Sequence, residues 1–312
     1  MTSRPLEVVS VNISEERGTA KRPVASLVVD ERGVVGDAHA GAWHRQVSLL
    51  GLESIERFSQ RAGMDLGPGD FAENVTVRGL DCAGISLLDR FRINQVELEV
   101  TQIGKACHGQ GCAIFQQVGR CVMPDEGIFT RVVQGGSIRP GDAVEFLPKT
   151  WRFRVITLSD RASHGEYEDR SGPRIRQLLE EFLESGRLRG EVESVLLSDD
   201  PAALRAELEA ARAADVEVVF STGGTGAGPR DRAPETVTAF CDRLIPGIPE
   251  ALRAKFGAGN PNAYLSRAVV GLAGTMVVYA LPGSVRAVEE YLGEILVTMQ
   301  HLLLMVRGID AH

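Results

Sequence analysis

VEVVFSTGGTGAGPRDRAPETVT, residues 216–238, joins a short apolar run to a glycine-rich turn and then to the start of a helix. The run at 216–220 is almost continuously apolar, which is typical of a strand covered on both faces of a parallel sheet. Pro234, with Glu235 beside it, is typical of the first turn of a helix. The stretch therefore predicts a strand, a turn and a helix of an α/β domain.

The turn is rich in glycine and hydroxyl side chains, so its backbone N–H groups could converge on an anion. The candidate binding residues are Gly223, Gly224, Thr225 and Gly226. Arg230 and Asp231 follow, a cation and a carboxylate that could hold a phosphate and the Mg²⁺ that accompanies it. The turn is not a Walker A loop, because no Gly-Lys-Ser/Thr follows it, and a tight turn with incidental charges is the alternative.

Size and composition indicate a globular protein of two domains. The chain has 312 residues, of which 44% are hydrophobic and 24% charged, and no apolar run is as long as a membrane span. The N-terminal residues lack an apolar segment followed by a cleavage site, which predicts a cytoplasmic protein. The net charge of −8 argues against the basic surface that nucleic-acid binding needs.

The second half of the chain, from residue 151, alternates predicted strands and helices. Four of its strands end in loops rich in Ser, Gly or Asp: LSDRAS, LSDD, STGGTG and LPGS. In an open parallel sheet these strand ends share one edge, and each loop leads to a helix N-terminus that favours anions. The candidate residues in or near these loops, besides those of the glycine-rich turn, are Ser159, Asp160, Ser171, Asp199 and Ser284. Helix capping by Ser or Asp is the alternative for any single loop.

The first half contains short predicted strands broken by glycine turns. Strands are expected at 6–13, 24–29 and 96–104, another within 68–80, and one helical pattern near 51–60. This pattern predicts a mostly β barrel. Polar residues are crowded in GDAHAGAWHRQ (36–46) beyond what a turn requires.

Cys107, His108, Cys112 and Cys121 fall within fifteen positions of one another. A zinc site is one interpretation, although the spacing lacks paired C-x2-C knuckles. A reactive thiol is another, because Lys105 and His108 flank Cys107 and would favour its thiolate. For Cys82 and Cys121, burial as ordinary core residues is the third interpretation.

Residues from about 1 to 147 resemble the MOSC family, a module named after the C-terminal domain of molybdenum-cofactor sulfurase. The segments that carry the resemblance are GDAHAG with the following RQVSLL, PGDFAEN, and TQIGKAC. The resemblance implies a β-rich barrel in which Cys107 is the sulfur-handling cysteine.

Residues 152–307 resemble the molybdopterin adenylyltransferase family, which is shared with a domain of gephyrin. The motifs are SDRAS with GEYEDRSGP, STGGTGAGPRDRAPE, IPGIPEALR, NAYLSRA and ALPGS. The family implies attack by the terminal phosphate of molybdopterin on the α-phosphorus of ATP, with pyrophosphate as the other product. This nucleophile is already ionised near neutral pH, so catalysis reduces to positioning and charge neutralisation.

The candidate residues suit that reaction in distinct roles. Asp199 and Asp231 would hold Mg²⁺, and Arg230 would stabilise the α-phosphate. The glycine-rich turn would cradle a pterin or nucleotide phosphate, with Ser159, Asp160 and Ser171 on neighbouring loops and Ser284 at a second phosphate site.

The sequence thus predicts a MOSC domain at 1–148 and a molybdopterin adenylyltransferase domain at 149–312, acting in molybdenum cofactor biosynthesis. The expected ligands are molybdopterin, ATP and Mg²⁺, and a bound molybdenum cofactor is also considered. A homotrimer is expected, with a molybdate-insertion protein and molybdoenzymes as partners. The alternative is a carrier that binds molybdopterin without turnover. Two retained carboxylates beside a polyphosphate favour the enzyme.

Overall fold

The computed structural model describes residues 5–105, 121–186 and 188–309. The chain divides into two compact units, one ending at Lys149 and also taking in Ile309, the other running from Thr150 to Gly308. Cys107, His108 and Cys112, on which the thiol and zinc interpretations depend, lie outside the described residues.

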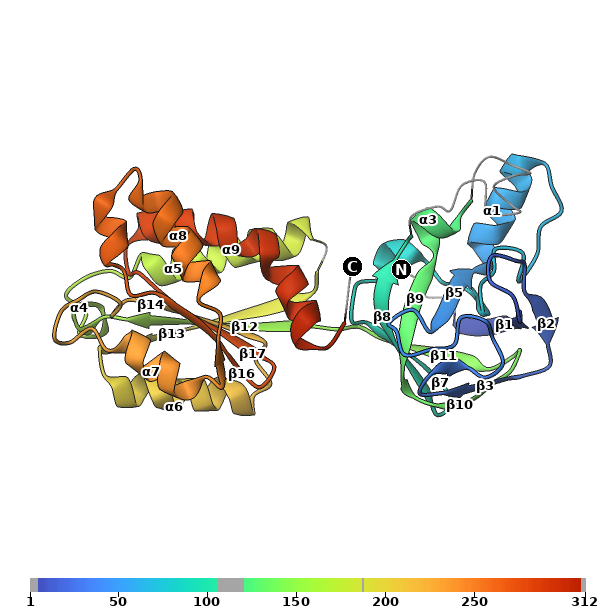
Figure 1. Ribbon diagram of the computed structural model, residues 1–312, viewed down its shortest axis with the longest axis horizontal. Helices are drawn as coiled ribbons and strands as arrows, with labels where there is room; N and C mark the ends of the chain where they lie inside the picture. The colour runs from blue at the N-terminus through green and yellow to red at the C-terminus, as the bar shows by residue number, and fades with distance from the viewer. Residues whose placement is uncertain (1–4, 106–120, 187, 310–312) are drawn as a thin grey trace. The chain divides into compact units, whose positions relative to one another are not determined.

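The first unit is a closed β barrel (Figure 1). Its ring, among the described residues, has the order β11-β7-β8-β9-β5-β6-β1, and β1 closes it on β11 through the pair Leu6 and Val144. The bounds are β1 Leu6–Ile13, β5 Val47–Gly51, β6 Val75–Arg78, β7 Arg90–Ile93, β8 Val96–Ile103, β9 Ile128–Gln134 and β11 Ala143–Leu147. This confirms the predicted mostly β barrel.

Smaller elements surround the ring. Strand β2 (Arg22–Val24) pairs with β1, and β10 (Gly136–Ile138), β3 (Leu27–Asp30) and β4 (Gly33–Val34) form a separate small sheet. Helix α1 (Leu52–Ala62) connects the parallel pair β5 and β6, and the short turns η1 (Cys82–Gly84) and α3 (Met123–Glu126) lie in connections. Alternate residues of the strands point inward and form one apolar core that includes Val8, Leu49 and Leu98.

The second unit is built on a six-stranded sheet of order β13-β12-β14-β17-β16-β15. Strands β12 (Trp151–Leu158), β13 (Gly190–Leu197), β14 (Val218–Thr222) and β17 (Met276–Leu281) are parallel. Strands β16 (Val269–Ala273) and β15 (Arg243–Leu244) continue the sheet in antiparallel fashion. The predicted α/β fold with a mainly parallel sheet is therefore confirmed, with an antiparallel edge that the sequence patterns did not predict.

Helices cover both faces of this sheet, giving three layers (Figure 1). Helices α5 (Ser171–Ser185), α8 (Gly247–Gly257) and α9 (Val285–Val306) lie on one face, and α6 (Pro201–Ala213) and α7 (Ala233–Phe240) on the other. The short helices α4 (Asp160–Ser163) and η3 (Pro261–Leu265) complete the unit. None of the helices in the described part of the chain combines the length and apolar character that crossing a membrane would need.

Candidate functional site

The glycine-rich turn after β14 has positive φ angles at two positions, a conformation that glycine adopts most easily. Gly223 has φ +104°, and a Cβ built there would lie 2.3 Å from the carbonyl oxygen of Leu158. Gly224 has φ +63°, in the left-handed region. The turn therefore packs directly against the end of the neighbouring strand β12.

This packing leaves backbone donors of the turn without protein partners. Among the described residues, no acceptor is found for the N–H groups of Gly224, Thr225 and Gly226. These residues line a cavity of about 550 Å³ that is also lined by Gly283, Ser284 and the first turn of α9. Free N–H groups at a helix start and in a glycine turn together make a donor set for anions.

Asp231 also lines this cavity, whereas Asp199 lines a separate small hollow together with Arg230. The Oδ2 atom of Asp231 accepts a hydrogen bond of 2.8 Å from Gly228 N. A Cβ on Gly226 would come within 2.7 Å of the same oxygen, so the carboxylate packs closely against the turn. The two carboxylates predicted to share one Mg²⁺ thus have different surroundings.

Asp199 is instead joined to Asp160 by two reciprocal hydrogen bonds. Asp199 N donates to Asp160 Oδ1 (2.9 Å), and Asp160 N donates to Asp199 Oδ2 (3.1 Å). The other oxygen of Asp160 accepts from Arg230 Nη1 at 2.9 Å, in a pair whose arginine side chain is 80% exposed. These contacts fasten the loop after β12 to the loop after β13 and bring three predicted residues together.

The three candidate serines take part in local hydrogen bonds. Ser159 Oγ accepts from Ala162 N, and Ser284 Oγ accepts from Ala287 N, so each caps a helix start. Ser171 Oγ donates to Asp169 at 3.2 Å. A capping hydroxyl still has its own proton to donate, so capping and ligand binding are compatible.

The residue patterns missed Asp169 and Arg267. Asp169 accepts from Thr157 Oγ1 (2.7 Å) and Gly172 N (3.1 Å), and so ties the start of α5 to β12. Arg267 contacts the carbonyl oxygens of the glycine-rich turn from behind the cavity. Both lie inside the quoted motifs GEYEDRSGP and NAYLSRA, but no spacing rule singles them out.

The described residues contain no cluster of three or more His, Cys, Asp or Glu side chains able to hold a metal ion. Single carboxylates such as Asp231 and Asp199 still suit Mg²⁺, because this ion commonly takes one or two carboxylates and fills its other positions with water and substrate phosphates. Asp231 is a carboxylate that lines the same cavity as the free N–H groups.

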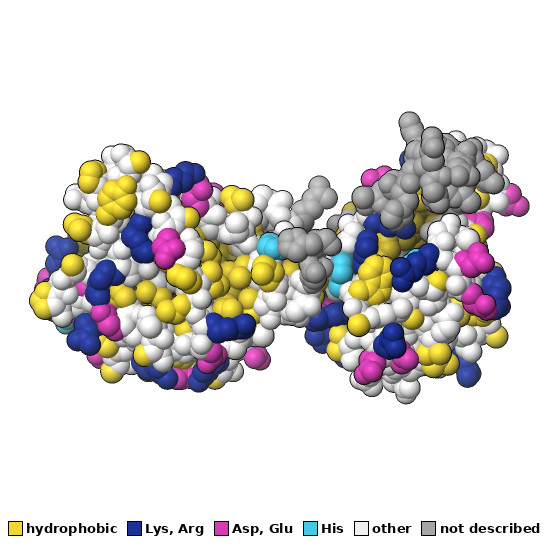
Figure 2. Space-filling model, viewed as in Figure 1, with side chains coloured by type: hydrophobic (Ala, Val, Ile, Leu, Met, Phe, Trp, Pro, Cys, Tyr) yellow, Lys and Arg dark blue, Asp and Glu magenta, His cyan; other side chains and the backbone are white. Residues whose placement is uncertain are grey.

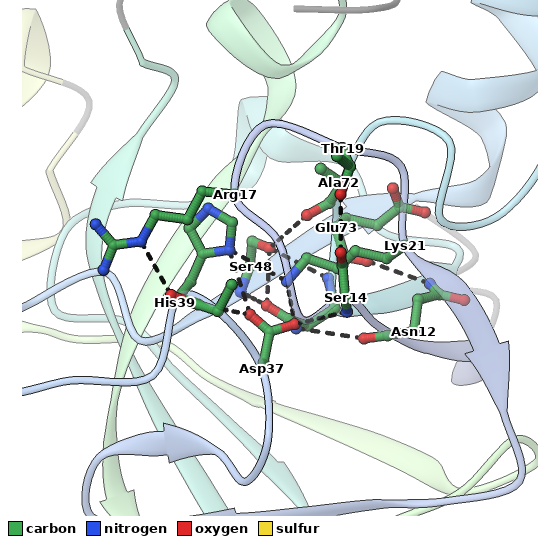
Figure 3. A network of polar contacts seen from close by, with 12 residues as sticks. Asn12, Ser14, Arg17, Thr19, Lys21, Asp37, His39, Ser48, Ala72 and Glu73 are labelled. Carbon is green, nitrogen blue, oxygen red and sulfur yellow. Dashed lines mark hydrogen bonds and ion pairs between the residues drawn. The ribbon is translucent and has the colours of Figure 1, made fainter.

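A second polar cluster lies in the barrel, centred on Asp37 (Figure 3). Asp37 Oδ2 accepts from Lys21 Nζ (2.5 Å), Asn74 Nδ2 (3.1 Å) and Ser14 N (3.2 Å). Its Oδ1 accepts from His39 N (2.9 Å), and His39 Nδ1 lies 3.2 Å away. Part of the polar crowding seen at 36–46 in the sequence therefore reflects a buried ion pair.

Burial and pairing have opposite effects on the charges of this cluster. Burial alone raises the pKa of Asp37, but the hydrogen bonds from His39 and Lys21 and the Lys21 charge lower that pKa well below its usual range. Burial lowers the pKa of Lys21, and Asp37 opposes this. Each partner thus keeps the other charged inside the barrel.

Glu73 lies near the same ammonium group and is completely buried. Its Oε1 accepts from Gly69 N (2.6 Å) and Thr76 Oγ1 (2.7 Å), while Oε2 has no hydrogen-bond partner in the described part of the protein. Burial raises the pKa of this carboxyl, against the hydrogen bonds from Gly69 and Thr76, which lower it.

The described cysteines have the properties of partly buried thiols. Cys82, Cys121 and Cys241 are half-buried and form no disulfide. Burial raises the pKa of Cys82, and it raises the pKa of Cys241 to about 11. Cys82 and Cys241 are therefore mainly protonated at neutral pH and are poor nucleophiles.

Comparisons with known proteins agree with this division of the chain. The family described as "MOSC domain" matches residues 36–145, and the family described as "Probable molybdopterin binding domain" matches residues 154–301. The chain is 36% identical over 156 residues to the molybdenum cofactor biosynthesis bifunctional protein of Synechococcus elongatus, covering 50% of this chain and 47% of that protein. The chain thus spans about half the length of that relative.

Two shorter relatives from Escherichia coli K12 are covered more completely. Molybdenum cofactor biosynthesis protein B is 35% identical, with 46% of this chain and 81% of that protein covered. Molybdopterin adenylyltransferase is 34% identical, with coverage of 46% and 72%. A solved structure of the tungsten cofactor synthesizing protein from Pyrococcus furiosus is 36% identical, with coverage of 51% and 99% and a TM-score of 0.46. The chain belongs to the family of these molybdenum cofactor biosynthesis proteins. The domain that it shares with them, at 154–301, lies C-terminal to the MOSC domain at 36–145.

Proposed function

We propose that the second unit adenylylates molybdopterin. A terminal phosphate oxygen of molybdopterin forms a bond to the α-phosphorus of ATP, and the bond from that phosphorus to the bridging oxygen breaks. Pyrophosphate leaves with the electron pair, and adenylylated molybdopterin is the other product. The observation that supports this most is the 550 Å³ cavity, which is lined both by the glycine-rich turn with its unpaired N–H groups and by the start of α9.

The protein's part in this reaction is to position two anionic substrates and to offset their charge. The N–H groups of Gly224, Thr225 and Gly226 bind one phosphate group, and Ser284 with the first turn of α9 binds another. Asp231 would hold Mg²⁺, which offsets negative charge on the phosphate oxygens when bound. Asp199, on the neighbouring loop after β13, is proposed as the second carboxylate that would hold Mg²⁺.

Arg230 is proposed to offset charge on the α-phosphate. Its pair with Asp160 is exposed on the arginine side, and exposed ion pairs contribute only about 0–1 kcal/mol. Moving the Arg230 guanidinium from Asp160 to a phosphate group therefore costs little free energy. A charge-assisted hydrogen bond to the α-phosphate, whose negative charge increases as the molybdopterin phosphate oxygen adds to it, would more than replace the lost contact.

The direct test incubates the full chain with molybdopterin, ATP and Mg²⁺ and measures pyrophosphate. We expect pyrophosphate release that requires all three components, together with a molybdopterin species heavier by one AMP group in mass spectrometry. Tight molybdopterin binding without pyrophosphate would instead support the carrier function. Omitting molybdopterin controls for simple ATP hydrolysis.

We propose that the barrel handles sulfur or bound molybdenum cofactor through Cys107, the thiol flanked by Lys105 and His108. Such a thiolate can carry sulfur as a persulfide. Because the thiols of Cys82 and Cys241 have raised pKa values, Cys107 should be alkylated before either of them at neutral pH. Mass spectrometry after brief alkylation measures this order, and faster labelling of Cys82 or Cys241 would contradict the assignment.

We also propose a cytoplasmic homotrimer formed through the second unit, which passes its product to a molybdate-insertion protein and then to molybdoenzymes. Large apolar side chains are exposed on this unit, including Val297 at 80%, Leu265 at 66% and Met305 at 56%. Figure 2 shows hydrophobic side chains gathered on one face of this unit. Light scattering would measure the assembly, and a monomer at working concentration would contradict it.

A further inference from the structure

Arg267 follows η3 and precedes β16, and it contacts the glycine-rich turn at three points. Its backbone N donates to Thr225 O at 3.0 Å, and its Nε donates to Gly226 O at 2.7 Å. Its Nη2 donates to the carbonyl oxygen of Asp231. One residue thus holds both ends of the segment 225–231.

These contacts fix the direction in which the N–H groups of the turn point. In a trans peptide the C=O and N–H bonds point in opposite directions. Because the carbonyls of Thr225 and Gly226 face Arg267, the N–H groups of Gly226 and Ala227 face away from it. Gly226 and Ala227 line the cavity, and neither N–H has an acceptor among the described residues. Arg267 does not line the cavity and acts from outside it.

A carboxylate keeps the guanidinium in this position. Glu235, in the first turn of α7, accepts from Arg267 Nη1, and this hydrogen bond lowers the pKa of Glu235. All three side-chain nitrogens of Arg267 are therefore engaged, two with the turn and one with Glu235. Lysine, with a single nitrogen, cannot reproduce this fork.

We infer that Arg267 is a positioning residue that orients the N–H groups of the turn for phosphate binding and holds the backbone of Asp231, the proposed Mg²⁺ ligand. This inference rests on the proposed adenylylation. Arg267 touches no substrate in this role. It acts through the N–H groups of Gly226 and Ala227, and these groups contact the phosphate.

The test compares Arg267→Ala and Arg267→Lys with the full-length parent protein in the pyrophosphate assay. We expect kcat of Arg267→Ala to fall about 10²-fold, since a misplacement of about 1 Å can have that effect. Arg267→Lys should recover less than a tenth of the lost rate. Added guanidinium ion at low millimolar concentration should restore part of the activity of Arg267→Ala, because it can occupy the space and donate to the same carbonyls.

Arg253→Ala is the matched control. Arg253 lies on α8, and its Nη1 lies 3.4 Å from Ser266 O and 3.5 Å from Ala268 O, on either side of Arg267, without contacting the turn. Its kcat should stay within about threefold of the parent, as expected for a site that leaves the turn in place. The midpoint of thermal unfolding is measured for every variant, so that unfolding is distinguished from mispositioning.

Parental kcat in folded Arg267→Ala would overturn the inference, and so would an equal loss of kcat in Arg253→Ala. A loss of kcat in Arg267→Ala that guanidinium does not restore, and that is accompanied by unfolding of the variant, would also overturn it. A parent protein that releases no pyrophosphate would instead contradict the proposed adenylylation itself. The parent assay thus separates failure of the function from failure of the role of Arg267.

Discussion

Asp231→Asn is expected to lower the rate of pyrophosphate release by at least about 10²-fold, the range found when a preorganised charge-stabilising group is removed. The change keeps the shape of the side chain and an oxygen that can accept from Gly228 N, so the turn should stay folded. What it removes is the negative charge beside the free N–H groups of the cavity, where a Mg²⁺ ligand is proposed. Molybdopterin binding should persist, because the N–H donors are unchanged. Initial rates at several Mg²⁺ concentrations measure the effect.

Asp199→Asn should act in the same direction, with Asp160 N still able to donate to the remaining oxygen. Asp200→Asn is the matched control one position further along. Asp200 caps α6 by accepting from Ala202 N, a role that asparagine fills equally well. A parental rate in Asp231→Asn or Asp199→Asn would show that the charge of that residue is not needed. An equal loss in Asp200→Asn would show that any charge change in this loop disturbs the unit.

The fold of the second unit was largely predictable because its signals are local. The apolar run of β17 and the cap at Ser284 mark the end of a strand and the start of a helix within a few residues of each other. Parallel pairing of β12, β13, β14 and β17 then places the four predicted loops at one edge of the sheet. Helix α5 begins at Ser171, next to Asp169, which accepts from Gly172 N.

The supports of the site were not predictable because they depend on distant pairing. Arg267 reaches Gly226 and Asp231 across 41 and 36 positions, and it does so only because β16 returns antiparallel beside β17. The sequence also suggested that Asp199 and Asp231 share one metal ion. In the structure the direct partner of Asp199 is Asp160, since the ends of β12 and β13 are neighbours.

The same limit applies to the barrel. The crowded polar stretch at 36–46 was visible, but the partners of Asp37 come from other parts of the ring. Lys21 precedes β2 and Asn74 precedes β6, both strands pair with β1, and the two side chains meet at Asp37. Hydrophobic alternation predicts which residues face inward, and it does not predict that an inward-facing lysine and aspartate will meet.

Asp37→Asn is expected to lower the free energy of unfolding of the barrel by about 3–5 kcal/mol, the usual cost of removing one partner of a buried ion pair. The Lys21 and Asp37 side chains are each 1% exposed, so without the carboxylate the ammonium is left charged in the interior or must lose its proton. The expected loss should be smaller at high pH, where Lys21 can be neutral. In the parent, the Asp37 contribution is present above its ordinary pKa of 3.8 and is lost only as pH falls through its lowered folded value.

Urea unfolding followed by Trp43 fluorescence measures this change, with Trp151→Phe as the background so that only the barrel reports. Trp43 is well placed because its Nε1 donates to His39 O, next to Asp37. Asp81→Asn is the matched control: Asp81 is exposed, caps η1 by accepting from Ala83 N, and should change stability by less than about 0.5 kcal/mol. Adding Lys21→Met to Asp37→Asn should recover part of the loss, because the unpaired charge is then gone. A cost for Asp37→Asn no larger than that of Asp81→Asn, at every pH, would mean that the buried pair contributes nothing to the stability of the barrel.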